Sequence, residues 1–220
     1  MEMRKIMRAG KTVFLIMCIC MLGLAACGER TDEEMDDDAA VSSISLKKDG
    51  SISSKIVEDF QESDYDMNGL KSMIETSIEE YKLEDAEANI TLKSCKVENG
   101  FTNVQIEFDN FNSYAGFNNE HFFAGTIQGA NQAGFDLDVT LNAASDNSEN
   151  ATVSKPELLG MGSNHIVILE LEKPEEGQEV QPIRVNCFDE ILYVGDGVTV
   201  VGKKSADVSL AEGYGIIVFK

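Results

Sequence analysis

The chain has 220 residues, which is enough for one domain with a sizeable hydrophobic core. Its 39 acidic and 18 basic residues give a formal net charge of −21 at pH 7. Because this charge repels phosphate backbones and anionic lipid headgroups, the composition argues against nucleic acid as a partner. Divalent cations and basic surfaces are compatible with it, although the same charge would also keep a crowded protein soluble.

The first 26 residues have the composition of a secretory signal peptide. Four basic residues lie before position 12, and residues 12–26 carry no charge. This run of about 15 residues is shorter than the roughly 20 that span a bilayer core. The basic start, the short apolar run and the small residues at its end predict export and removal of the segment. An uncleaved anchor helix is the alternative.

The apolar run ends in Leu24-Ala25-Ala26-Cys27, which resembles the lipobox of bacterial lipoproteins. The resemblance implies cleavage between Ala26 and Cys27 and a diacylglyceryl group on the Cys27 thiol, and no resident cofactor is expected. Two acyl chains anchor a protein stably, whereas one binds only marginally. We therefore expect a protein that is lipid-anchored at the cell membrane and faces outside the cytoplasm.

Residues 28–40 contain seven acidic residues and no aliphatic residue larger than methionine. Such a segment cannot bury an apolar face, so residues 27–41 are expected to form a disordered acidic tether. A single extracytoplasmic domain is expected over residues 42–220, with a subdivision near residues 142–156 as the alternative.

Two β-hairpins are expected in the first half of this domain. The first lies within Val41–Phe60 and has Asp49-Gly50 at its turn. The second joins Ile90–Val97 to Phe101–Phe108 through Asn99-Gly100. Asp-Gly and Asn-Gly favour the two-residue turns that connect antiparallel strands.

Two helices are expected. Met67–Tyr81 repeats apolar residues at helical spacing, and Asp66 or Asn68 can cap its start. A weaker pattern over Phe123–Ala133 predicts a second helix that ends at Gly134.

The rest of the chain has mostly strand patterns. Residues 135–141 alternate as a strand, residues 142–155 are expected to be a loop or linker, and only strands are expected beyond. A third hairpin is expected from Ile191–Val194 to Val198–Val201. The predicted fold class is therefore α+β, a mostly antiparallel sheet built from hairpins with one clear and one weaker helix packed on it.

Three segments of the body resemble those of small uncharacterised lipoproteins from Gram-positive anaerobes. They are Gly69–Glu75, Phe122–Thr126 and Ile191–Val194. This resemblance implies an envelope location, and it implies no activity.

A calcium loop is one candidate site. Asp64, Asp66 and Asn68, the turn glycine Gly69 and Glu75 have the spacing of an EF-hand loop, whose oxygen ligands these residue types supply. The alternative is a helix N-terminus, because the preceding segment has a strand pattern and a lysine occupies the position that is usually aliphatic. We expect the helix start.

An aromatic set between positions 108 and 123 is the second candidate. Phe111, Tyr114, Phe117 and His121 lie among several asparagines, and aromatic platforms beside amide donors suit sugars or peptides. The alternative is an aromatic core beneath a loop. The chain has no tryptophan, which weakens the sugar interpretation.

No catalytic motif is evident. His121 and His165 are the only histidines, and neither has the partner spacing of a zinc site. Of the five cysteines, Cys95 and Cys187 remain after the signal and the lipidation site, and we expect them to be free rather than bridged.

The sequence therefore predicts a non-enzymatic, membrane-tethered binding domain for an envelope protein or a small ligand. The alternatives are an envelope enzyme, such as a hydrolase, with an unrecognised site and a calcium-dependent structural module. A polar cleft around His121 or His165 would favour the enzyme. An apolar core with a bare sheet face would favour binding.

Overall fold

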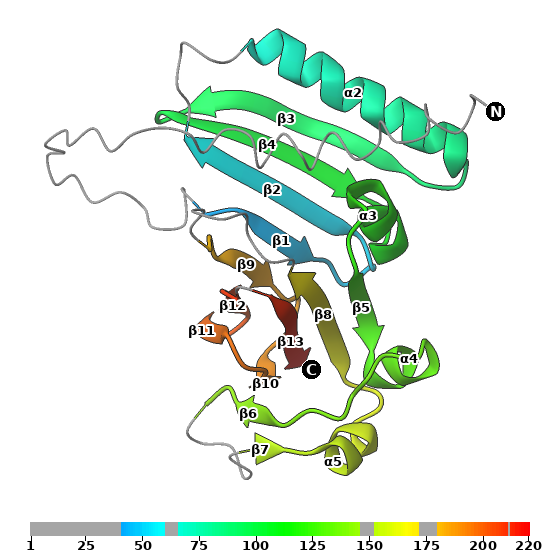
Figure 1. Cartoon of the computed structure of the whole chain (residues 1–220), viewed down its shortest axis with the longest axis vertical. Coiled ribbons are helices and arrows are strands. Elements are labelled where there is room, and N and C mark those ends of the chain that lie inside the picture. Colours follow the sequence, from blue (N-terminus) through cyan, green and yellow to red (C-terminus); the bar gives the residue numbers. More distant parts are fainter. Residues whose placement is uncertain (1–40, 60–65, 146–151, 172–179, 211) are drawn as a thin grey trace, which may run out of the picture.

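The computed structural model describes residues 41–59, 66–145, 152–171, 180–210 and 212–220. The predicted signal peptide, Cys27, the tether up to residue 40 and Asp64 lie outside these residues. The described helices are α2 (Met67–Glu84), α3 (Phe111–Asn118), α4 (Ile127–Gln132) and α5 (Lys155–Gly160). The described strands form two sheets, with the helices around them (Figure 1).

Sheet A has seven strands in the order β11-β12-β9-β1-β2-β4-β3. They are β1 (Ser43–Leu46), β2 (Ile52–Asp59), β3 (Ile90–Glu98), β4 (Phe101–Phe108), β9 (Ile183–Asn186), β11 (Val198–Gly202) and β12 (Ser205–Val208). Neighbouring strands are antiparallel except β1 and β9, which pair in parallel.

Sheet B has six strands in the order β5-β8-β13-β10-β6-β7, and all its pairs are antiparallel. They are β5 (Phe122–Thr126), β6 (Leu141–Ala143), β7 (Thr152–Val153), β8 (His165–Leu171), β10 (Ile191–Val194) and β13 (Gly213–Phe219). The predicted α+β class with mostly antiparallel strands is confirmed.

The first two predicted hairpins are confirmed. β1 pairs with β2, and β3 pairs with β4. At the second turn, Asn99 and Gly100 both have positive φ, at 53° and 80°, as a tight turn between twisted strands requires. The first predicted helix is also present, and it runs on to Glu84.

The third predicted hairpin is wrong. β10 pairs with β13 and β6 in sheet B, whereas β11 pairs with β12 in sheet A. The segment between β10 and β11 therefore carries the chain from one sheet to the other. Gly197 makes this crossing possible, because its φ is 69° and an added Cβ would lie 2.1 Å from Leu210 Cδ2.

The second predicted helix is correct only in part. Residues 123–126 belong to β5, which pairs with β8 along its whole length, and α4 begins at Ile127. The Thr126 hydroxyl caps this helix by accepting a hydrogen bond from the Gly129 amide at 3.0 Å. β5 is apolar on both faces, so it lacks the alternation that identifies a strand in the sequence.

Two helices were not expected and one strand is shorter than expected. α3 lies in the aromatic loop, where the Asn110 side chain accepts a hydrogen bond from the Ser113 amide at 3.0 Å. α5 lies where a linker and then only strands were predicted, and Glu157 accepts a hydrogen bond from the Ser154 amide at 2.9 Å. Of residues 135–141, only Leu141 belongs to a strand.

The core has two parts on opposite faces of sheet B. The first part lies between the two sheets and includes the buried sides of α2 and α3. The second lies on the other face of sheet B, beneath α4 and α5. β8 serves both, since Val167 and Leu169 face the first part while Ile166 and Ile168 face the second. Sheet A contributes to the first part alone, which leaves its other face outside the core.

Candidate binding face on the seven-stranded sheet

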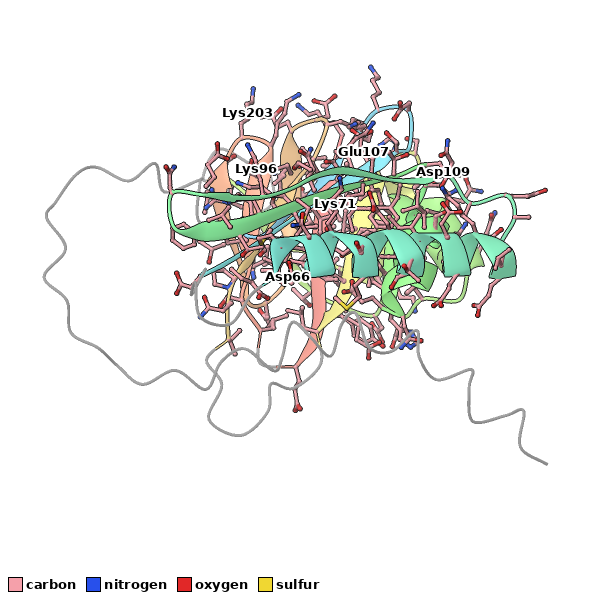
Figure 2. The ribbon with its side chains drawn as sticks, turned by 90° about the horizontal axis from the view of Figure 1, so that it is seen from above. Asp66, Lys71, Lys96, Glu107, Asp109 and Lys203 are labelled. Carbon is pink, nitrogen blue, oxygen red and sulfur yellow. The ribbon has the colours of Figure 1, made fainter. Side chains whose placement is uncertain are left out.

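Strands of sheet A alternate between the core and the solvent over much of their length, although the paired residues Val57 and Asn103 are buried on the side away from the core. In β1, Ile44 and Leu46 are buried, while Ser43 and Ser45 are partly exposed. Figure 2 shows Lys96, Glu107 and Lys203 on the side of the strands opposite to α2. All four described helices pack against the first or the second part of the core, so none of them covers this side of sheet A.

On this side, twelve polar residues from six strands form two rows, and within each row the residues pair from one strand to the next. We call these twelve residues the outer face. The first row contains Asp207, Arg184, Ser43, Lys55, Gln105 and Ser94. The second row contains Ser205, Asn186, Ser45, Ser53, Glu107 and Thr91. All twelve side chains are partly or fully exposed.

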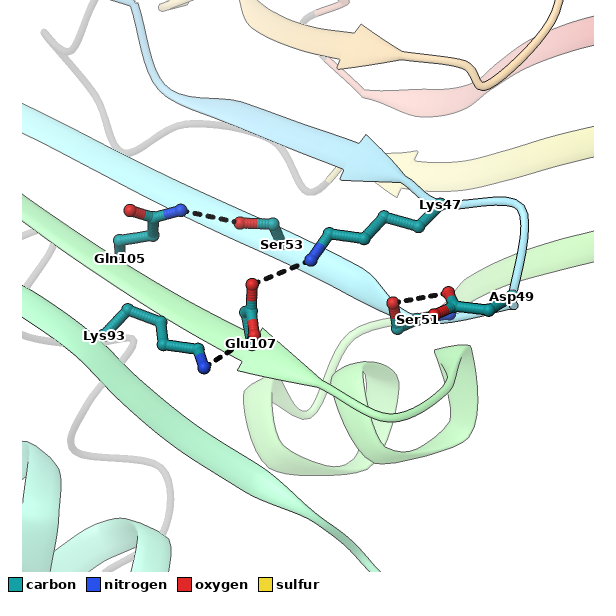
Figure 3. A network of polar contacts seen from close by, with 7 residues as sticks. All are labelled: Lys47, Asp49, Ser51, Ser53, Lys93, Gln105 and Glu107. Atoms are coloured by element: carbon teal, nitrogen blue, oxygen red, sulfur yellow. Dashed lines mark hydrogen bonds and ion pairs between the residues drawn. The ribbon is translucent and has the colours of Figure 1, made fainter.

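Hydrogen bonds between strands hold the side chains of the outer face. Asn186 donates to Ser45 Oγ at 3.1 Å and accepts from the Ser205 hydroxyl at 2.8 Å, which links three strands. Gln105 donates to Ser53 Oγ at 3.1 Å and so links β4 to β2 (Figure 3). These bonds fix the side chains, so less conformational entropy is lost when a partner binds.

Arg184 and Asp207 form a bidentate ion pair within the first row. Arg184 Nε lies 2.7 Å from Asp207 Oδ1, and a terminal nitrogen lies 3.0 Å from Oδ2. The two side chains are 16% and 19% exposed, so this pair is better shielded from water than an ordinary surface pair. The planar fork of arginine fixes the orientation of the carboxylate as well as its charge.

Glu107 lies between two lysines in the second row. One carboxylate oxygen is 2.7 Å from Lys47 Nζ, and the other is 2.9 Å from Lys93 Nζ (Figure 3). The hydrogen bond from Lys47, followed by that from Lys93, holds the pKa of Glu107 below its usual value. The glutamate therefore stays ionised at neutral pH, and the group of three carries one net positive charge.

The predicted calcium residues do not converge in the described part of the loop. The Asp66 carboxylate accepts a hydrogen bond from the Asn68 amide at 3.0 Å, as an N-cap does. Glu75 pairs instead with Lys71 at 3.8 Å on the exposed side of α2. Asp64 lies outside the described residues. Within the residues that the structure describes, no group of three or more His, Cys, Asp or Glu side chains is arranged to hold a metal ion.

Two members of the aromatic set belong to the core. Tyr114 and Phe117 are buried, and their rings pack at 5.2 Å and 5.7 Å from the ring of Phe108. The Tyr114 hydroxyl donates to Glu120 at 3.0 Å, and burial raises the pKa of Tyr114 well above its usual value. This packing favours the core interpretation that the sequence left open.

Of the other two members, Phe111 is partly buried and packs against both parts of the core, whereas His121 is exposed. Phe111 packs against Phe123, with the ring centroids 5.0 Å apart. The His121 side chain is 81% exposed and lies 3.6 Å from Glu170. The structure therefore does not bring the four predicted residues together on one surface.

His165 and Cys187 occupy apolar surroundings, whereas Cys95 is partly exposed. The imidazole of His165 stacks on Phe219 and meets Phe188 edge-on, at 5.3 Å and 4.8 Å between centroids. Cys95 and Cys187 are free thiols in the structure, and burial raises the pKa of Cys187 to about 12. A thiol with such a pKa is a poor nucleophile at neutral pH.

Sequence reasoning did not single out the outer face, although a signal for it was present. Ser43 and Ser45 alternate with buried residues, as do Ser53 and Lys55 in the neighbouring strand. Each strand alone looks like an ordinary half-exposed strand. Only the register, which joins distant strands such as β1 and β9, places these residues in common rows.

Comparison with known proteins does not place the chain in a family. Neither the family models nor the curated proteins nor the solved structures gave a significant match. Among the described residues, no helix is both long enough and apolar enough to cross a membrane.

Proposed function

We propose that this chain is a membrane-tethered extracytoplasmic lipoprotein. The lipobox-like Leu24–Cys27 segment after a short apolar run supports this location. Replacing Cys27 with serine removes the thiol that would carry the lipid. The Cys27→Ser variant should carry no lipid and should retain its N-terminal segment uncleaved, which immunoblotting of fractionated cells would detect as a larger product. Continued membrane association with cleavage after Ala26 would contradict the proposal.

Its body acts as a non-enzymatic domain that binds an envelope partner through the outer face of sheet A. The observation that supports this role is the pair of registered polar rows, whose side chains are already held by hydrogen bonds. An antiparallel sheet often has one solvated face without any binding role. Side chains that are already ordered by bonds to neighbouring strands favour binding, because they lose little further conformational entropy when a partner binds.

The two predicted rivals receive less support. The described side chains around His165 are aromatic, and His121 lies on an open surface, so neither forms the polar cleft that an enzyme would need. The Asp66 carboxylate is engaged in capping α2, which favours the helix start over a calcium module.

Photocrosslinking in the producing cells tests the binding face. A photoreactive amino acid at Ser53, in the centre of the outer face, should give a discrete crosslinked product. The matched control carries the photoreactive amino acid at Glu79, which lies on the exposed side of α2 with a side chain 77% exposed. This control should give no crosslinked product. Equal crosslinking at both positions, or crosslinking at Glu79 alone, would refute the outer face as the binding surface.

A further inference from the structure

Six lysines gather at one end of sheet A, although the chain carries a formal net charge of −21. We call them the lysine cluster: Lys47, Lys48, Lys93, Lys203, Lys204 and Lys220. They come from the β1–β2 turn, from β3, from the β11–β12 turn and from the position after β13. Segments far apart in sequence therefore supply one basic surface at the edge of the outer face.

Two carboxylates in this cluster each bind two lysines. Glu107 bridges Lys47 and Lys93, as described above. Glu190 lies 3.6 Å from Lys203 Nζ and also accepts a hydrogen bond from Lys220. Each arrangement shows that a carboxylate fits between two ammonium groups of the cluster, and each leaves one positive charge in excess.

The β1–β2 turn connects the Glu107 group of ion pairs with the Glu190 group. Asp189 lies close enough to Lys204, Lys220 and Lys48 for each of them to help lower its pKa, after the larger effect of the Glu190 amide. Lys48 follows Lys47 directly in the chain, so it connects the Glu107 group to the Glu190 group. With Asp49 in the same turn, the six lysines outnumber the four carboxylates named so far, which are Glu107, Glu190, Asp189 and Asp49.

Among the described residues, the acidic side chains of α2 do not cancel this local charge. Salt screens exposed charges over about 8 Å at physiological ionic strength. The acidic side chains of α2 lie across sheet A from the outer face, because this helix packs on the core side. A partner that approaches the outer face therefore meets the lysine cluster before the acidic side chains of α2.

We infer that the lysine cluster binds an acidic polypeptide segment, whose carboxylates dock between the ammonium groups. The inference rests on the proposed function, since it names the chemistry of the partner that the outer face would bind. Lysine presents a compact point charge on a long stem, which suits a series of glutamate or aspartate side chains. Glu107 and Glu190 already display the contact that such side chains would make.

Titration with a 16-residue polyglutamate peptide tests this inference. The chain from residue 27 onward, with Cys27→Ser to prevent lipidation, should bind the peptide at physiological ionic strength, as measured by calorimetry, because the acidic charges elsewhere are screened under that condition. The double variant Lys48→Gln and Lys203→Gln should bind about tenfold more weakly, because each exposed pair is worth up to about a fivefold change in affinity. The control Lys71→Gln and Lys82→Gln, on α2, changes the net charge equally and should alter the affinity less than about twofold.

Three outcomes would overturn the inference. They are the absence of binding at physiological ionic strength, equal weakening in both double variants, and equally tight binding of a polyphosphate of matched charge. The last outcome would show general attraction of anions. If Ser53 crosslinks to a partner while polyglutamate fails to bind, the proposed binding face stands and only the acidic partner is refuted.

Discussion

The two sheets come very close at Gly215 in β13 and Val208 in β12. A Cβ atom added at Gly215 would lie 2.4 Å from Val208 Cγ1, and Val208 is buried. Because a β-branched side chain rotates little about χ1, we expect Gly215→Ala to destabilise the fold by about 1–3 kcal/mol. Gly160→Ala, where the added atom meets nothing within 4 Å, is the control. Urea denaturation of both variants measures the difference.

A double-mutant cycle identifies the cause of this effect. Val208→Ala removes the atoms that the new methyl group would meet, so the double variant should be less destabilised than the two single changes added together. Simple additivity would mean that Gly215→Ala acts through the backbone and not through the contact between the sheets.

The charge of Glu107 should contribute to stability in a pH-dependent way. Its pKa in the folded chain is lowered from 4.5 by Lys47 and Lys93. A lowered pKa stabilises the fold above the unfolded-state value, and this contribution is lost as the pH falls through the folded value. Glu107→Gln should therefore cost less than about 1 kcal/mol at pH 7, because the three side chains are partly exposed.

Denaturation of both proteins at pH 7 and at pH 3 tests this sign. The difference between the wild type and Glu107→Gln should shrink at the lower pH, where the glutamate becomes protonated. A difference that grows on acidification would contradict the assignment of the ion pairs.

At the scale of single residues, the sequence predicted caps and turns better than shared surfaces. Asp66 was expected at the start of a helix and lies there, because an N-cap is decided by a few neighbouring residues. The neighbours of Glu107 could not be predicted in the same way. Lys47 is 60 positions away, and only the pairing of β1, β2 and β4 brings its side chain within reach.

At the scale of elements, α2 gives a test of the calcium hypothesis. Asp66→Ala should cost about 1 kcal/mol through loss of the cap. The melting temperature of the wild type should stay nearly constant as calcium rises to extracellular levels, since capping needs no metal. A saturable rise that is abolished by Glu75→Gln would show a working calcium site, because a bound ligand stabilises the folded state.

Besides the unexpected helices α3 and α5, the errors in predicting elements involved the strands of sheet B. Its strands are apolar on both faces, so β5 has no alternation and was taken as part of a helix. β10 and β11 have a glycine-rich segment between them, which is typical of a hairpin. In sheet A, with one polar face, alternation identified the β1–β2 and β3–β4 hairpins correctly, whereas the β11–β12 hairpin was not predicted.

At the scale of the molecule, the segment near residues 142–156 bears on whether the domain is one unit. On one side of it, Leu141 lies in β6, which pairs with β10 in the middle of sheet B. On the other side, Val153 and Leu158 are buried in the same cluster as Leu141. Since the described residues flanking the segment share one part of the core, we expect them to unfold together.

Thiol labelling can detect this cooperativity across the whole molecule. Cys187 is buried in the first part of the core, whereas Leu158 is buried in the second. Leu158→Ala should cost about 2–5 kcal/mol through loss of packing. If the domain unfolds as one unit, labelling of Cys187 in mild urea should accelerate at least about 20-fold, since each 1.4 kcal/mol is a factor of ten in population.

Leu159 supplies the control for this experiment, because it lies next to Leu158 in α5 but its side chain faces solvent at 39% exposure. Leu159→Ala should change the labelling rate of Cys187 only slightly, as surface substitutions usually alter stability by less than about 0.5 kcal/mol. Two subdomains would behave differently. Leu158→Ala would then produce a separate early transition in circular dichroism while the labelling of Cys187 kept its wild-type rate. That result would place a boundary near residues 142–156 and would contradict a single cooperative domain.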